Sequence, residues 1–194
     1  MKRRTLLTLA LAAVVGVAGC AGQGRAGSAR AEGAEAADAR LGTVEAFPGG
    51  QRKPAPPVTS ELLDGTAFDL TAWRGEVVVI NFWGSWCAPC RAEAPDLQAA
   101  YLATRDLGVR FLGVDVRDER DAATALQDGF GITYPSLFDP AGRIALAFTD
   151  VPPNVVPATL LLDRALRIAA VFRKRVHRAE PEAAVRALAT EDAS

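Results

Sequence analysis

Two cysteines separated by two residues follow closely on a long apolar run in this 194-residue chain. The run is VVVINFW, Val77 to Trp83, and the pair is Cys87 and Cys90 within WCAPC. A run so rich in β-branched and aromatic residues predicts a strand that is buried on both faces of a sheet. The next residues predict a helix from about Cys87 to Leu107, with Gly108 as its stop. The pair is therefore expected where a central strand is followed by a helix.

This position gives the two sulfur atoms different chemistry. Cys87 is expected at the helix N-terminus, where free backbone amides and the helix dipole favour negative charge, so it is the predicted nucleophilic thiolate. Cys90 follows one turn later on the same helix and is expected to be less exposed, which suits a resolving thiol. Trp86 is predicted to offer a flat apolar surface for a substrate chain beside the Cys87 sulfur. The motif therefore predicts reversible thiol-disulfide exchange.

Two other roles for the cysteine pair are open. A structural zinc site needs four ligands, and the one histidine of the chain, His177, lies far from the pair in an arginine-rich segment. A purely structural disulfide would close a very short loop, so it would restrict the unfolded chain little and stabilise the fold little. We therefore expect neither a metal nor another cofactor.

The rest of the chain predicts a single α/β domain. Asp64 and Gly65 lie between two short apolar stretches, which favours a hairpin. Further strands are expected at 109–116, 158–163 and 168–172, further helices at 118–129 and 142–148, and a terminal helix near Pro181, whereas 131–139 is expected to be irregular. Elements in the order β-α-β-α and then β-β-α predict a mixed sheet with helices on both faces.

The N-terminus is typical of an export signal. Three basic residues precede an uncharged run, 5–19, that is too short to cross a bilayer comfortably. The run ends in VAGC at Cys20, which resembles the lipobox of bacterial lipoproteins, where the cysteine is lipidated and becomes the new N-terminus. An ordinary secretory signal remains an alternative, and the Arg3-Arg4 pair also fits a twin-arginine signal. We expect a lipoprotein signal peptide at 1–19.

Composition sets the remaining boundaries. Residues 20–53 contain few large apolar side chains, so a flexible tether is expected there and the folded domain at 54–190. Lys and Arg number 22 against 23 Asp and Glu, with no basic cluster, so no nucleic-acid partner is predicted. If Cys20 is lipidated, Cys87 and Cys90 remain alone in an oxidising compartment, where a pair is expected.

The segment NFWGSWCAPCRAEAP, 81–95, resembles the active-site segment of the thioredoxin superfamily, and more closely that of exported TlpA/ResA-like thiol-disulfide oxidoreductases. The resemblance covers about 57–188. It implies an α/β, thioredoxin-like fold with a mixed central sheet flanked by helices and a βα insertion between the active-site helix and the cis-proline strand. Downstream, VVPATLLLD is similar to the segment that carries this proline, which implies that Pro157 is cis and that Val156 contacts substrate backbone.

The resemblance also implies a role for an acidic residue. Cytoplasmic thioredoxins carry a buried aspartate where this chain has Asn81, and an amide cannot act as a general base. In ResA-like members a glutamate three residues after the second cysteine is implicated, and Glu93 stands at that position. We therefore expect Glu93 to raise the apparent thiol pKa values and to aid proton transfer at Cys90. A solvated helix residue without such a role is the alternative.

The partners follow from the same resemblance. It implies a lipid-anchored protein on the extracytoplasmic face of the cell membrane that exchanges electrons with thiols or disulfides of exported proteins. A membrane thiol transporter would supply the electrons, and apocytochrome c would be one substrate, in cytochrome c maturation. The uncharged Ala88-Pro89 dipeptide favours this reductive direction. The alternatives are an oxidase that forms disulfides in exported proteins, a thioredoxin-fold peroxidase and a copper chaperone.

Overall fold

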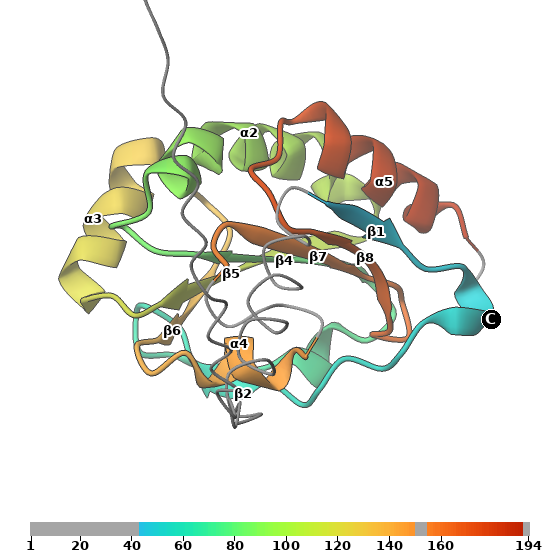
Figure 1. Ribbon diagram of the computed structural model, residues 1–194, viewed down its shortest axis with the longest axis horizontal. Helices are drawn as coiled ribbons and strands as arrows, with labels where there is room; N and C mark the ends of the chain where they lie inside the picture. The colour runs from blue at the N-terminus through green and yellow to red at the C-terminus, as the bar shows by residue number, and fades with distance from the viewer. Residues whose placement is uncertain (1–42, 150–154, 192–194) are drawn as a thin grey trace, which may run out of the picture.

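A six-stranded mixed sheet with the order β1-β8-β7-β4-β5-β6 forms the centre of the computed structural model, which describes residues 43–149 and 155–191 (Figure 1). The strands are β1 (Val44–Ala46), β2 (Thr59–Glu61), β3 (Ala67–Asp69), β4 (Val77–Trp83), β5 (Val109–Val116), β6 (Ser136–Asp139), β7 (Ala158–Leu162) and β8 (Ile168–Phe172). The helices are α2 (Ala88–Thr104), α3 (Arg120–Phe130), α4 (Arg143–Ala147) and α5 (Ala179–Ala189), with short 3-10 turns at Gly49–Gln51, Leu70–Trp73 and Arg105–Leu107.

Strand β4 lies at the centre of the sheet and is buried along its whole length, as the apolar run predicted. It pairs parallel with β5 and antiparallel with β7. The alternating residues Val77 and Val79 pack in a core under α2 and α5, whereas Val78, Ile80 and Phe82 pack in a second core on the opposite side. Figure 1 shows α2, α3 and α5 over one face of the sheet and α4 with the β2–β3 hairpin over the other. The predicted mixed sheet between helices is confirmed.

Helix α2 begins directly after Cys87, which is its N-cap. The helix continues to Thr104, and a 3-10 turn then leads to Gly108. Gly108 adopts a left-handed backbone with φ of 71°, which a glycine accepts without the strain that a side chain would bring. The predicted start and stop of this helix are therefore confirmed, and the register of α2 fixes where the two cysteines lie.

The region after β5 differs from the sequence expectation. Helix α3 begins at Arg120, not at Asp118, because the Asp118 carboxylate binds Ser85 and leaves the helix start without a side-chain cap. The segment expected to be irregular contains β6, which pairs parallel with β5. Only four residues form this edge strand, and its hydrogen bonds depend on the free edge of β5, so its own sequence carries little signal. Helix α3 and β6 occupy the place predicted for the βα insertion.

The predicted tether ends earlier than Lys53. Strand β1 pairs antiparallel with β8, and the Lys53 carbonyl accepts a hydrogen bond from the Ile168 amide at 2.8 Å. All three residues of β1 are exposed, so backbone hydrogen bonds to the edge of β8 hold the strand, and burial contributes little. Amino-acid composition indicates whether a segment can be buried, but it does not reveal backbone hydrogen bonds. For this reason the composition of this exposed segment predicted a tether. Residues 43–53 therefore belong to the folded domain and not to the tether predicted at 20–53.

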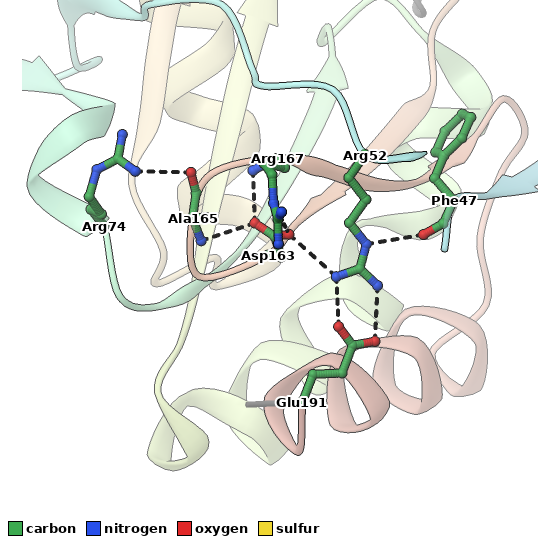
Figure 2. Close-up of polar contacts among 7 residues, drawn as sticks. All are labelled: Phe47, Arg52, Arg74, Asp163, Ala165, Arg167 and Glu191. Atoms are coloured by element: carbon green, nitrogen blue, oxygen red, sulfur yellow. Dashed lines mark hydrogen bonds and ion pairs between the residues drawn. The ribbon is translucent and has the colours of Figure 1, made fainter. Parts of the chain in front are cut away.

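Arg52 links this N-terminal segment by ion pairs to the β7–β8 turn and to the segment after α5 (Figure 2). Its guanidinium binds Asp163 in the β7–β8 turn at 3.3 Å and Glu191 after α5 at 2.6 Å. Its Nε also donates to the Phe47 carbonyl at 3.0 Å. The side chains of Arg52 and Asp163 are 6% and 8% exposed, so little water competes for these contacts. Arg167 completes the charge pairing of Asp163 at 2.8 Å.

We expect Arg52→Ala to lower the free energy of unfolding by about 2 kcal/mol, because it removes charge-assisted hydrogen bonds to a mostly buried carboxylate. Urea unfolding followed by circular dichroism measures this. Arg105→Ala is the matched control, since Arg105 is half exposed and lies 3.9 Å from an exposed Asp106, and it should change stability by less than about 0.5 kcal/mol. Equal midpoints for the two variants would contradict the anchoring role of Arg52.

The predicted signal peptide at 1–19, Cys20 and the tether as far as residue 42 lie outside the described residues. In the part of the chain that the structure describes, no helix has both the length and the apolar character needed to cross a membrane.

Candidate active site

The two cysteines of WCAPC are joined by a disulfide bond at the start of α2. The backbone N–H of Cys90 donates to Sγ of Cys87 at 3.2 Å, so the first sulfur sits where the free amides of the helix start can stabilise its thiolate. Both residues are 4% exposed, so the expected difference in exposure is absent. The bond holds the two sulfurs together, and Trp83 and Ala123 pack with both cysteines in one cluster.

Trp86 presents an exposed aromatic surface next to the disulfide. The residue is 48% exposed, and its indole Nε1 donates to the Val116 carbonyl at 3.2 Å. The Arg117 guanidinium lies over the ring at 5.1 Å. The indole also folds back on Gly84, where a Cβ atom would be only 2.5 Å from Nε1, so the ring position requires glycine there. The ring is thus held rigidly while one side remains open to a substrate.

Ser85, the residue before Trp86, is bound to the loop that follows β5. Its backbone N–H and its hydroxyl both donate to the Asp118 carboxylate, the hydroxyl at 2.8 Å. Its carbonyl accepts a hydrogen bond from Arg91 of α2 at 2.7 Å. The loop that leads into Cys87 is therefore tied on one side to the β5–α3 connection and on the other to α2.

The Val156-Pro157 peptide bond is cis, as the resemblance implied. Pro157 is buried at the start of β7, and Ala158 pairs with Phe82 of β4. This pairing brings the segment beside the cysteines, where Val156 packs against the cluster that contains both of them. Val156, Trp86 and the disulfide thus come from separate segments and meet at one end of β4.

Glu93 is a buried carboxyl, which contradicts the alternative of a solvated helix residue. It is 1% exposed, Asn81 donates to Oε1 at 2.8 Å, and the Val176 amide donates to Oε2 at 2.9 Å. The second amide hydrogen of Asn81 goes to Thr159 Oγ1 at 3.1 Å. Burial raises the pKa of Glu93 to about 7, although the hydrogen bonds from Val176 and Asn81 act in the opposite direction. The group therefore changes charge near neutral pH, three residues after Cys90 on the same helix.

Asp115 was not singled out from the sequence, although an acidic residue inside VRFLGVDV is an anomaly that could have drawn attention. Its side chain is fully buried on β5, level with Trp83 of β4. Burial and the nearby charge of Asp118 raise the pKa of Asp115 to about 8. The candidate site thus holds two buried carboxyl groups, Glu93 and Asp115, with raised pKa values.

A large pocket lies away from the cysteines. It has a volume of about 1000 Å³ and surrounds the contacts of Arg52, Asp163 and Glu191 in Figure 2. Its charged groups already bind one another, and it holds no nucleophile, so it is no candidate for the chemistry. Nor do the described residues contain a group of three or more metal-binding side chains, and His177 is exposed with Asp96 as its neighbour at 3.5 Å.

Comparison with known proteins gives a consistent family. The profile of the AhpC/TSA family matches residues 52–171. Thiol-disulfide oxidoreductase ResA of Geobacillus thermodenitrificans is 33% identical over 110 residues, which cover 57% of this chain and 62% of that protein. ResA of Bacillus subtilis is 30% identical over 109 residues, covering 56% and 59% respectively. The chain therefore matches about three fifths of the length of these curated relatives.

Solved structures extend the similarity over most of the described fold. A secreted thiol-disulfide isomerase from Corynebacterium glutamicum is 34% identical with a TM-score of 0.73, covering 76% of this chain and 92% of that one. A DsbF homologue from Corynebacterium diphtheriae is 35% identical with a TM-score of 0.72, covering 75% and 93%. The chain belongs to the AhpC/TSA family, as a TlpA/ResA-like member of the thioredoxin superfamily.

Proposed function

We propose that this protein is a thiol-disulfide oxidoreductase that reduces disulfides of exported proteins through Cys87 and Cys90. The observation that carries the proposal is the position of Cys87, which caps α2 and receives the Cys90 amide at its sulfur. The exposed ring of Trp86 and the side chain of Val156 flank this sulfur and give a substrate chain an apolar surface. The names of the ResA and Corynebacterium relatives support thiol-disulfide exchange as the chemistry.

In the first step the Cys87 thiolate attacks one sulfur of a substrate disulfide. A bond forms between Cys87 and that sulfur, the substrate S–S bond breaks, and the other substrate sulfur leaves as a thiolate that takes up a proton. The free backbone amides at the helix N-terminus stabilise the attacking thiolate. The product of this step is a mixed disulfide between Cys87 and the substrate.

In the second step the Cys90 thiolate attacks Sγ of Cys87. The Cys87–Cys90 bond forms, the mixed disulfide breaks, and the second substrate sulfur leaves as a thiolate. Two electrons have then passed from the cysteine pair to the substrate. We assign Glu93 as the base that accepts the Cys90 proton, because it is buried, lies one helical turn further along α2 and has a pKa near neutrality.

Glu93→Gln is expected to slow disulfide reduction about a hundred-fold at pH 7, since a buried general base is lost while the shape is kept. Removal of the negative charge should also move the alkylation profile of Cys90 to lower pH, because a like charge disfavours the thiolate. Rapid-quench alkylation of the reduced protein across pH 5–10 measures the shift. Asp96→Asn is the control on the same helix, as this side chain faces Arg175 and His177. An unchanged alkylation profile in Glu93→Gln would exclude the assigned role.

The cellular setting is part of the same proposal. We assign a lipid anchor at Cys20, a tether that precedes the described domain, and a place on the extracytoplasmic face of the cell membrane. A membrane thiol transporter would keep the pair reduced, and apocytochrome c would be one acceptor of its electrons. A secreted relative supports a place outside the cytoplasm, and the VAGC segment that ends at Cys20 supports the anchor.

The experiment that tests the proposal mixes the reduced chain with a peptide that carries an oxidised C-x-x-C-H motif. We expect one peptide disulfide to be lost for each Cys87–Cys90 disulfide gained, counted by mass spectrometry after alkylation. A peptide that remains oxidised while the protein thiols persist would overturn the reductive assignment.

A further inference from the structure

Asp115 is a buried carboxyl group that the mechanism above leaves without a task. It lies on β5 in register with Trp83 of β4 and Phe138 of β6, so these three side chains share one face of the sheet. Trp83 packs in one cluster with Cys87 and Cys90. Asp115 therefore lies beneath the redox site, on the same side of the sheet as the disulfide.

The Asp115 side chain has an unusual neighbour. Neither of its oxygens receives a hydrogen bond from a donor group of the described residues. The nearby charged group that acts on it most strongly is the carboxyl group of Asp118, three residues further along the chain. Two carboxyl groups can share a hydrogen bond only when one of them carries the proton, because an ionised carboxylate is an acceptor alone. An ionised Asp115, buried and without a hydrogen-bond donor near a second carboxylate, would be strongly unfavourable.

The surroundings decide which carboxyl group holds the proton. Burial, together with the charge of Asp118, raises the pKa of Asp115 to about 8. Burial alone would also raise the pKa of Asp118, but hydrogen bonds from Ser85 and Glu119 outweigh it and hold that pKa below its usual value. At neutral pH the proton therefore belongs to Asp115, and the charge to Asp118.

The charged Asp118 is the group that holds the loop before the disulfide. Its carboxylate accepts both hydrogen bonds of Ser85. The two residues before Asp118 both contact Trp86. Val116, the last residue of β5, does so through its carbonyl, and Arg117 does so through its guanidinium. The last residue of β5 and the two residues after it thus support the loop 84–86. The buried carboxyl group nearest to this charge is Asp115, so its protonation state acts on the support that Asp118 gives.

We propose that Asp115 is a protonated positioning residue, which donates a hydrogen bond to Asp118 and so holds the loop that presents Trp86 and Cys87 to the substrate. The inference rests on the proposed function and deepens it. When Asp115 loses its proton at alkaline pH, the donor disappears and two adjacent negative charges repel each other. The loop then loses its support, and the site becomes slower although both thiols are more ionised.

Other titrating and charged groups surround Asp115 and must be separated from it. Asp139 at the end of β6 adds a further negative charge that raises its pKa. From α3, Arg120 lies over the Phe138 ring at 4.3 Å. Helix α2 contributes Glu93 and, in the reduced protein, the two thiols of the WCAPC motif. The titration is therefore measured on the oxidised chain, in which the cysteines carry no proton, and repeated with Glu93→Gln.

The first test is a carboxyl carbon-13 NMR titration of the oxidised full chain. We expect the Asp115 resonance to titrate near pH 8 and to keep that midpoint in Glu93→Gln, whereas Asp118 stays ionised through the same range. A midpoint of Asp115 near its ordinary value of about 4 would overturn the inference. This measurement uses the unaltered side chain, so it remains decisive even if a variant fails to fold.

The second test separates the hydrogen bond from the packing. Asp115→Leu removes the donor and is expected to lower kcat/KM for insulin disulfide reduction about tenfold at pH 7, the effect of one lost hydrogen bond to a charged group. Asp115→Asn keeps a donor that cannot ionise, so it should restore most of that loss and remove the decline above pH 8. Asp121→Asn, at an exposed position in the first turn of α3, is the control that changes neither.

Equal loss in Asp115→Leu and Asp115→Asn, or an alkaline decline that persists in Asp115→Asn, would contradict the inference. Failure of the proposed function has a different signature. If the wild-type chain reduces no disulfide at any pH while Asp115 titrates near pH 8, the proposed function fails and the proton on Asp115 stands.

Discussion

Cys87→Ser is expected to lower the rate of disulfide reduction by at least about a thousand-fold, because the hydroxyl group is not ionised near neutral pH and cannot replace the attacking thiolate. Cys90→Ser is expected to block a different step of the reaction. It still attacks the substrate through Cys87, but no second thiol resolves the product, so a covalent complex with the substrate accumulates. Stopped-flow turbidity of insulin measures the rates, and non-reducing electrophoresis shows the complex.

The difference between the two variants tests the order of the two steps. Cys87 caps α2 and accepts the Cys90 amide, so it alone has the helix amides around its sulfur. Equal burial of the two cysteines leaves this electrostatic difference as the basis for the assignment. A covalent complex in Cys87→Ser and none in Cys90→Ser would reverse the roles of the two thiols.

The second large effect is a loss of stability of the oxidised protein as pH rises. Asp115 has a pKa of about 8 in the folded protein, against about 4 in an unfolded chain, so the folded state binds more protons between these values. The contribution of Asp115 to stability is then greatest below the lower value and falls as pH rises toward the upper one, by about 1.4 kcal/mol per pH unit and about 5 kcal/mol in all. Glu93, with a pKa of about 7, acts in the same direction.

Urea unfolding of the oxidised wild type and of Asp115→Asn at pH 5, 7 and 9 measures this effect. The asparagine cannot ionise, so the stability of the variant relative to the wild type should increase by several kcal/mol from pH 5 to pH 9. Asp121→Asn should follow the wild type at every pH. Parallel curves for the wild type and Asp115→Asn would show that Asp115 keeps the same pKa in both states.

The elements that the sequence predicted correctly are those with signals of their own. The run of β4, the cysteine at the start of α2 and Gly108 at its end each lie within the element that they specify. Strands β1 and β6 were missed because both are short edge strands whose hydrogen bonds come from β8 and β5. A short strand that forms because a neighbouring strand has a free edge shows little hydrophobic pattern in its own sequence.

The candidate site also contains features that the sequence could predict and features that it could not. Family resemblance indicated Glu93 but not its buried hydrogen bond from the amide of Val176, which is 83 residues away in the chain. The burial of Asp115 could be foreseen from the apolar residues around it in β5. Its proximity to Asp118 could not, because it depends on the connection after β5, where Arg117 has a φ of 54°. Residue types are visible in the sequence, whereas their partners emerge only from the fold.

The reduction potential of the Cys87–Cys90 pair is the most direct test of the central claim that this protein donates electrons to exported proteins. The full chain is equilibrated with dithiothreitol or glutathione buffers, and free thiols are trapped and counted. We expect a reversible two-electron transition at about −270 mV or lower, near the value of thioredoxin. A value near about −120 mV would contradict the account, because a pair so easily reduced donates disulfides instead of electrons.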